Sequence, residues 1–374
     1  MEKINFKKTV IGIIVLCMIS NSCKQNKNHD DLNGEILKNQ YSKTFSIAKT
    51  IDGYDLKIKN RFDNTDFQTY HLTKDKKIAG ITIPVKKIIC LSTTHCAFIS
   101  ELNEISTIKG ISGTKYIFND KILEKIIKNE IIDVGYDAQI NYEKIISIKP
   151  DVIFAYAVDN NSISVYQKLE KIGIPIIYIN DFIETTPLGR SEWIKFFACF
   201  FDKFDFAQNY FDSICNNYNL VIEKINKNNK NKPKILLNLP YKGIWWVPGG
   251  KSYFANFIKD AGGNYIFSNN NSEESIPYTM EDIFKKAEDA EIWLNPNEFF
   301  KKDEIINFDK RLRLFKPINL KKIYNNNKRM GKNGGNDFWE SGIIKPDKIL
   351  KDLYLIFFTE DINADSLYFY KKIE

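Results

Sequence analysis

The side chains in this sequence that could do chemistry are aromatic rings and carboxylates rather than a catalytic set. The chain contains only three histidines, His29, His71 and His95. It contains none of the G-x-S-x-G, H-E-x-x-H or G-x-x-x-x-G-K-[ST] motifs of serine hydrolases, zinc peptidases and P-loop enzymes. We therefore expect a protein that is not an enzyme. We also do not expect a bare Zn²⁺ or Mn²⁺ site built from several histidines.

Net charge and cysteine spacing exclude two further classes of function. The formal net charge is +7, and the positive charge is spread along the chain rather than gathered in a basic stripe, so no nucleic-acid partner is expected. No C-x-x-C pair or cysteine–histidine spacing indicates a metal site. We expect the cysteines beyond the amino-terminal segment to be small buried hydrophobic residues, namely Cys90, Cys96, Cys199 and Cys215.

Two stretches of the sequence, 85–180 and 232–358, show alternating strand and helix patterns. The elements that they predict would position the candidate residues. Near-continuous apolar runs, such as 151–157 and 174–180, are typical of strands in a parallel sheet that is covered on both faces. Between the two stretches, residues 202–228 repeat apolar side chains at steps of three and four without Pro or Gly. This pattern predicts one helix roughly 35–40 Å long. The expected fold class is therefore α/β, with two doubly wound lobes joined by a single long backbone helix.

The first residues form a targeting signal. A basic segment precedes the apolar run 10–19, which is too short to span a bilayer, and residues 20–22 (Ser-Asn-Ser) then precede Cys23. This arrangement resembles a bacterial lipoprotein lipobox with Cys23 as the acylated residue; an ordinary secretory signal cut nearby is the alternative. A polar tether (24–44) and a β-hairpin (45–72) are expected to follow.

Ligands of doubly wound sheets bind at the carboxyl ends of the strands, and the loops expected there carry polar and aromatic residues. Aromatic rings suit a large flat or chelated ligand because they give wide apolar contact at a low entropic cost, although core packing is the alternative for each ring. The candidates are Ser92, Thr93, His95, Tyr116, Tyr136, Tyr156, Asp159, Tyr241, Trp245, Trp246 and Trp339. Because neighbouring strand residues point to opposite sides, one of Trp245 and Trp246 is expected in the core and the other at the surface. His95 has two open interpretations, contact with the ligand or a structural role at the start of a helix.

Several segments resemble a known family. The segments 85–95, 133–156 and 168–180 look like the first lobe of substrate-binding proteins of ABC importers, in the subgroup that carries ferric siderophores, vitamin B12 and haem. The segments 243–267 and 279–296 resemble the second lobe of the same proteins. The similarity covers roughly residues 80–358, and its most specific run is NYEKIISIKPDVIF. It implies a class III periplasmic-binding-protein fold with little hinge closure, since one helix joins the lobes.

Glu143 and Glu281 occupy equivalent places, each in the first turn of an expected helix. One interpretation is a capping box, with Asn141 or Thr279 as the cap and an acid favoured by the helix dipole. The resemblance offers a second interpretation, because the family carries one exposed glutamate per lobe that docks onto arginines of the membrane permease. The two roles can coexist.

The resemblance implies a lipoprotein that captures an iron chelate (a siderophore or haem) or cobalamin between its lobes and delivers it to an inner-membrane ABC permease with its ATPase. The protein is then expected to be a monomer without a cofactor of its own, anchored by lipid on the periplasmic side of a bacterial membrane. The alternative is a surface-exposed lipoprotein that captures cargo for an outer-membrane partner. The identity of the chelate, the membrane leaflet and the role of the hairpin stay open.

The expected organisation divides the chain into six parts. They are a signal with lipobox (1–23), a tether and hairpin extension (24–80), an N-terminal lobe (81–201), a linking helix (202–230), a C-terminal lobe (231–344) and a final helix with tail (345–374).

Overall fold

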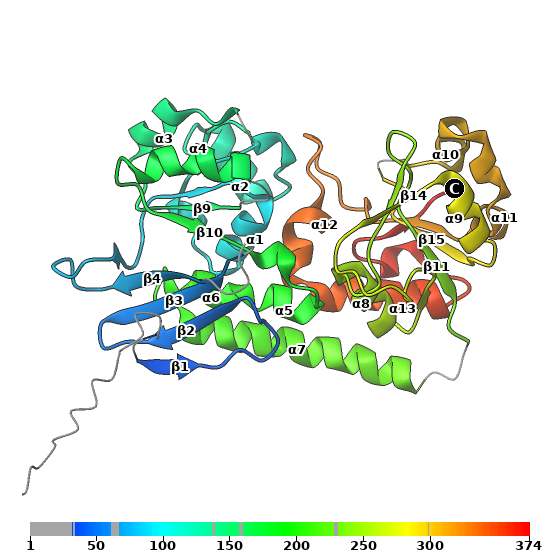
Figure 1. Ribbon diagram of the computed structural model, residues 1–374, viewed down its shortest axis with the longest axis horizontal. Helices are drawn as coiled ribbons and strands as arrows, with labels where there is room; N and C mark the ends of the chain where they lie inside the picture. Colours follow the sequence, from blue (N-terminus) through cyan, green and yellow to red (C-terminus); the bar gives the residue numbers. More distant parts are fainter. Residues whose placement is uncertain are drawn as a thin grey trace, which may run out of the picture. The chain divides into compact units, whose positions relative to one another are not determined.

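Three five-stranded sheets and a long helix organise the part of the chain that the computed structural model describes (Figure 1). The described residues are 32, 34–60, 67–136, 139–156, 160–227, 231–297 and 299–374, without the side chains of 160–162. The predicted signal, Cys23 and Asp159 lie outside this part. Within it, no helix combines the length and the apolar character needed to cross a membrane.

The N-terminal lobe is a parallel sheet in the order β10-β9-β6-β7-β8. Its central strand β6 is fully buried on both faces, as the apolar run predicted. The strands are β6 (Ile88–Cys90), β7 (Ile108–Ile111), β8 (Ile132–Asp133), β9 (Val152–Ala155) and β10 (Ile176–Tyr178). The helices are α1 (Thr93–Glu101), α2 (Asp120–Ile127), α3 (Tyr142–Ile148), α4 (Asn160–Glu170), α5 (Pro187–Ser191) and α6 (Trp193–Cys199).

The C-terminal lobe repeats this design in the order β13-β11-β15-β16-β17, with β17 antiparallel at the edge. A separate antiparallel pair, β12 (Trp245–Val247) and β14 (Ile276–Tyr278), lies outside that sheet. The sheet strands are β11 (Lys234–Leu237), β13 (Asn264–Tyr265), β15 (Ile292–Leu294), β16 (Ile323–Asn325) and β17 (Lys371–Lys372). The helices are α8 (Tyr253–Asp260), α9 (Met280–Lys286), α10 (Lys302–Phe308), α11 (Lys316–Leu320), α12 (Asp337–Glu340) and α13 (Pro346–Phe358).

One strand prediction in this lobe is wrong in its first half. The sequence pattern of residues 318–327 predicts a strand, but α11 continues to Leu320 and β16 begins only at Ile323. Pro317 stands in the first turn of α11, where its fixed φ and missing N–H favour a helix start.

The predicted linking helix is confirmed as α7 (Phe204–Asn226), which spans 23 residues. Its buried side chains, among them Ala207, Phe211 and Ile225, follow the predicted stripe. The helix packs against α6 on one side of the linkage and against α13 of the C-terminal lobe on the other. The two lobes therefore share one helical support.

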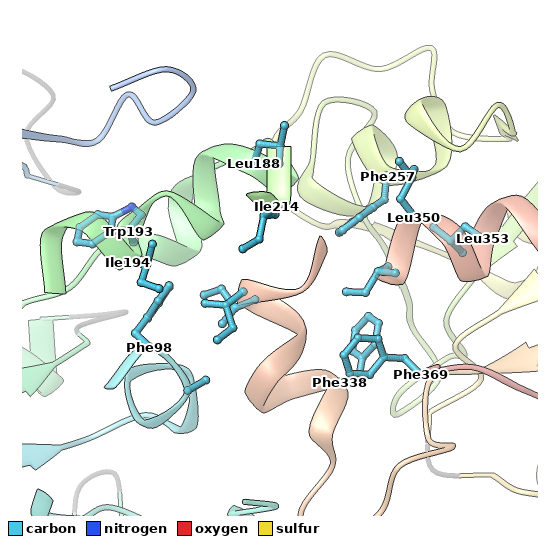
Figure 2. Close-up of a cluster of buried hydrophobic side chains, with 14 of the residues drawn as sticks. Phe98, Leu188, Trp193, Ile194, Ile214, Phe257, Phe338, Leu350, Leu353 and Phe369 are labelled. Carbon is cyan, nitrogen blue, oxygen red and sulfur yellow. The ribbon is translucent and has the colours of Figure 1, made fainter. Parts of the chain in front are cut away.

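The two lobes also share one apolar core. Figure 2 shows buried side chains from α1 (Phe98), α6 (Trp193), α12 (Phe338) and α13 (Leu350) gathered in the same cluster. The cluster extends to Phe45, which precedes the first lobe in the sequence. A continuous core of this kind resists separation of the lobes, because opening it would expose apolar surface to water.

The extension before the first lobe is larger than the predicted hairpin. It is a five-stranded sheet of β1 (Glu35–Leu37), β2 (Phe45–Lys49), β3 (Gly53–Lys59), β4 (Phe67–Thr73) and β5 (Ile81–Thr82). The predicted range 45–72 holds β2, β3 and most of β4, and β1 and β5 add one strand at each edge. The expectation of a loose tether as far as residue 44 is therefore wrong for residues 35–44. We call β1–β5 the N-terminal sheet.

A buried carboxylate, Glu192, holds the N-terminal sheet in place. Glu192 accepts hydrogen bonds from the backbone N–H groups of Gln40, Tyr41 and Ser42, each at 2.8 Å, and pairs with Lys195 at 2.8 Å. Neither Glu192 nor Lys195 is more than 1% exposed. A charged pair at such depth is tolerated only when its hydrogen bonds are complete, and here the segment before β2 supplies them.

Replacing Glu192 with Gln should lower the free energy of unfolding by on the order of 3–5 kcal/mol, because Lys195 would be left as an uncompensated buried charge. Urea denaturation measures this loss, and amide hydrogen exchange should report faster exchange at residues 40–44. The exposed Glu223 on α7 is the matched control, and Glu223→Gln should change stability by less than about 0.5 kcal/mol. Equal effects of the two substitutions would contradict this account of the anchor.

Candidate ligand-binding cleft

A cavity of about 980 Å³ opens where the segments after β10 and β11 meet the N-terminal sheet. Phe182–Thr185 follow β10, and Asn238 and Leu239 follow β11, so the carboxyl ends of strands from both lobes reach the cavity as a doubly wound fold requires. The α8 residue Asn256 donates from Nδ2 to the Thr185 carbonyl at 2.8 Å and ties these walls together. We call this cavity the cleft.

One wall of the cleft is aromatic and comes from the C-terminal lobe. Tyr241, Trp246 and Trp339 line it and remain 62%, 44% and 53% exposed. The Trp339 ring packs edge-on against Phe254, another lining residue, with 6.1 Å between centroids. Half-exposed rings on a packed base offer apolar area to a ligand without a large cost in side-chain entropy.

The alternation predicted for the tryptophan pair on β12 is confirmed. Trp245 is fully buried, where its Nε1 donates to the Leu237 carbonyl at 2.9 Å and its ring contacts Trp293 and Phe315. Trp246 therefore points to the other side of the strand and lines the cleft. The expectation that Trp245 lies at the ligand site is contradicted by its burial.

The structure also contradicts the expected cleft location of His95. Its imidazole is fully buried, with Nδ1 donating to the Phe154 carbonyl at 3.2 Å and the rings of Phe154 and Phe197 beside it. Burial lowers the pKa of His95 to about 3, so the ring is neutral. The geometry matches the structural interpretation of this residue.

The other first-lobe candidates do not line the cleft. Ser92 caps α1 by accepting from the Thr94 N–H, and Thr93 Oγ1 donates to the Trp339 carbonyl at 3.2 Å. Tyr116 and Tyr136 are 42% and 47% exposed and pack against each other at 5.5 Å, outside the residues that line the cleft. The candidate Tyr156, at the end of β9, is half-buried and is likewise not a described lining residue.

A segment of the C-terminal lobe, 329–340, bridges to the first lobe. Glu340 accepts from the N–H groups of Phe118 at 2.7 Å and Asn119 at 3.0 Å, and Asn333 Nδ2 donates to the Ile117 carbonyl at 2.7 Å. Gly335 is required here, because a Cβ would lie 2.3 Å from the Ile117 oxygen. We call this segment the bridging loop; it locks the lobes together beside the cleft.

Sequence reasoning missed the lining residues that come from the N-terminal sheet and from the segment after β10. They are Lys43, Thr44, Lys59, Phe182, Ile183, Glu184 and Thr185. Their local sequence predicts a tether, a hairpin and a loop, and nothing in it shows that the sheet folds back onto β10. The register and the buried Glu184 could be found only in three dimensions.

The two glutamates considered for docking are exposed at equivalent positions. Asn141 and Thr279 cap α3 and α9 as expected, accepting from the third helical residue, Lys144 or Asp282. Glu143 and Glu281 are the second residues of these helices, whereas a capping box needs an acid at the third, so the capping-box part of that interpretation is wrong. Both acids do lie in the first turn, where the helix dipole favours them. Glu281 is 79% exposed and lies 3.6 Å from Arg311, and the described residues give Glu143 no hydrogen bond or ion pair.

This fold and cleft define a class of two-lobed solute-binding protein. The family described as periplasmic binding protein matches residues 88–310, so the chain belongs to the periplasmic binding protein family. Membership of a solute-binding family agrees with the prediction that the chain is not an enzyme.

Individual relatives and solved structures are also similar to this chain. An uncharacterized lipoprotein of Methanocaldococcus jannaschii is 30% identical over 78% of this chain and 70% of its own length. A possible iron-binding (periplasmic solute-binding) protein of Staphylococcus epidermidis matches with a TM-score of 0.58 and 19% identity over 73% of this chain and 98% of its own. A periplasmic haem-binding protein of Pseudomonas aeruginosa matches with a TM-score of 0.55 and 13% identity over 73% and 93% of the two chains. These structural likenesses support the predicted class III architecture.

Glu340 should make the stability of the bridged lobes depend on pH. Burial raises its pKa to about 7, so the folded protein holds this proton more tightly than the unfolded chain, whose glutamate titrates near 4.5. The stabilisation is full below that lower value and is lost as pH rises through about 7. The stability of the wild type minus that of Glu340→Gln should thus fall between pH 5 and pH 8, by at most about 3 kcal/mol. Urea denaturation at several pH values checks this, and a difference that does not change with pH would contradict it.

Proposed function

We propose that this protein is a lipid-anchored solute-binding protein that captures an iron chelate, such as a siderophore or haem, or cobalamin in the cleft. The observation that carries the proposal is the aromatic wall of Tyr241, Trp246, Phe254 and Trp339 in a cavity of about 980 Å³. That volume lies at the upper end of ordinary small-molecule sites and suits a bulky ligand rather than a bare ion. Structural neighbours described as binding iron, haem and vitamin B12 support this class of cargo.

Delivery to an ABC importer is the second part of the proposal. Glu143 and Glu281 place one exposed carboxylate on each lobe, at the same position of corresponding helices. An acid at the start of a helix gains from the dipole, and neither glutamate makes a capping bond. Glu143 has no ion pair among the described residues, and Glu281 forms only an exposed ion pair with Arg311 at 3.6 Å, so a partner can reach both carboxylates. Two equivalent acids suit arginines on a permease with two similar halves, and their charge would steer the encounter.

The anchor and the rigidity of the protein complete the proposal. Cys23 lies outside the described residues, and the lipoprotein relative supports acylation at a cysteine of this kind. Acylation would tie the chain to the membrane surface that holds the permease. The shared core and α7 favour cargo capture with little closure of the lobes, since no flexible multi-strand hinge joins them.

Trp246→Ala should weaken binding of cargo by on the order of 1–3 kcal/mol, because it removes a central ring of the aromatic wall. Native mass spectrometry and absorbance of the protein from its own source identify the cargo, and fluorescence titration then measures the affinity. Trp245→Ala is the matched variant on the same strand: its ring is buried, so it should lower stability by about 3–5 kcal/mol instead. If the folded Trp246→Ala protein binds cargo with unchanged affinity, the aromatic wall is not part of the binding site.

The double variant Glu143→Gln/Glu281→Gln should fold and bind cargo normally but lose uptake through the reconstituted importer. Each carboxylate contributes part of the binding to the permease, so each single variant should lose less uptake than the double variant. Residual association with the permease should depend less on salt, since fewer charges are screened. Glu223→Gln/Glu288→Gln removes two other exposed acids as a control and should leave uptake intact. Normal uptake by the double variant would instead favour the alternative of a surface lipoprotein that hands cargo to an outer-membrane partner.

A further inference from the structure

The N-terminal sheet contributes two cationic side chains to the cleft. Lys43, just before β2, and Lys59, the last residue of β3, both line it. The Lys59 N–H donates to the Thr44 carbonyl at 2.7 Å, so the two lysines lie at one corner of the sheet. Neither lysine has an ion-pair partner among the described residues. This corner of the cleft therefore carries two lysines without an ion-pair partner among the described residues.

The corner is held firmly against the first lobe. Glu184, only 4% exposed, accepts from the N–H groups of Lys43 at 3.0 Å and Thr44 at 3.1 Å, and from the hydroxyls of Ser42 and Thr44. All four of these donors bind Oε1 of Glu184, which ties that oxygen to residues 42–44. The end of β3 is held as well, because Asn180 of the first lobe donates from Nδ2 to the Lys59 carbonyl at 2.9 Å. The lysine backbones are thus preorganised, while their side chains remain available.

Charge in the cleft is divided between its walls. The other lining carboxylates, Glu273 and Glu274, belong to the C-terminal lobe in the segment before β14. The positive charges belong to the N-terminal sheet. Most of the aromatic rings come from β12, α8, α12 and the segment after β11, and Phe182 comes from the segment after β10. A ligand that fills the cleft therefore meets an apolar face and a separate cationic corner.

We infer that Lys43 and Lys59 make the cleft select a flat or bulky apolar cargo that carries anionic groups, such as carboxylates, on one side. This inference rests on the proposed function in that it takes the cleft as the binding site. It goes further by naming the charge of the cargo and by making the N-terminal sheet part of the site. That sheet lies before residue 88, where the match to the family model begins, so its lysines lie outside the matched segment.

A pair of fluorescent probes tests the inference without knowledge of the natural cargo. Anilinonaphthalene sulfonate is an aromatic anion, and N-phenylnaphthylamine is the same ring system without the sulfonate. The cargo-free wild type should bind the anion more tightly than the neutral probe. Lys43→Gln/Lys59→Gln should weaken the anion by about three- to tenfold and leave the neutral probe unchanged, as expected for two partly exposed charges. Added salt should reduce the difference.

Control variants locate the effect. Lys43→Arg/Lys59→Arg keeps the charge and should retain most of the preference for the anion. Lys49→Gln, an exposed lysine of β2 that does not line the cleft, should change neither probe. Trp246→Ala should weaken both probes and so place them in the cleft.

Several results would overturn the inference. They are equal loss of both probes in the double glutamine variant, no loss of the anion, or no preference for the anion in the wild type. Glu273→Gln/Glu274→Gln removes two negative charges from the cleft and should not weaken the anionic probe, so weaker anion binding in this variant would also overturn the inference. If the probes behave as expected but no cargo is found, the inference about Lys43 and Lys59 is supported and the proposed transport function is not. The two claims can therefore be tested separately.

Discussion

Buried carboxylates that accept backbone N–H groups from distant segments are the constraint on which this structure depends. Glu192 and Glu184 hold residues 40–44, and Glu340 holds residues 118 and 119. Each carboxylate is at most 4% exposed, so its desolvation is tolerable only while those donors remain in place. The contacts are therefore cooperative: a segment that detaches leaves a buried charge behind it.

These contacts set the shape of the cleft. Glu184 and Glu192 place the N-terminal sheet beside the segment after β10, where its lysines reach the cavity. Glu340 fixes the bridging loop against the first lobe, which positions Trp339 on the aromatic wall. The common core and α7 connect the elements that form the two sides of the cleft. The result is a preformed cleft, and preformed sites lose less free energy to ordering when a ligand binds.

Sequence patterns predicted what periodicity and local rules control. The buried parallel strands, the α7 stripe, the caps Asn141 and Thr279, and the opposite orientations of Trp245 and Trp246 all follow from repeats of two or 3.6 residues and from capping chemistry. These patterns do not predict where a side chain lies relative to segments that are distant in the sequence. His95 follows a strand end, as a ligand residue would, but the sequence does not show that Phe154 and Phe197 enclose it. The docking of the N-terminal sheet depends on pairing over about 150 positions, which no local pattern encodes.

The most direct test of this account asks which aromatic surface the cargo covers. Tyr241, Trp246 and Trp339 in the cleft and Tyr116 and Tyr136 outside it are all 42–62% exposed, so hydroxyl radicals should oxidise both groups in the free protein. Footprinting with and without the small-molecule fraction of the source cells then compares them within one sample. The account predicts protection of Tyr241, Trp246 and Trp339 with Tyr116 and Tyr136 unchanged. Protection of the Tyr116–Tyr136 pair, with the cleft still oxidised, would contradict it.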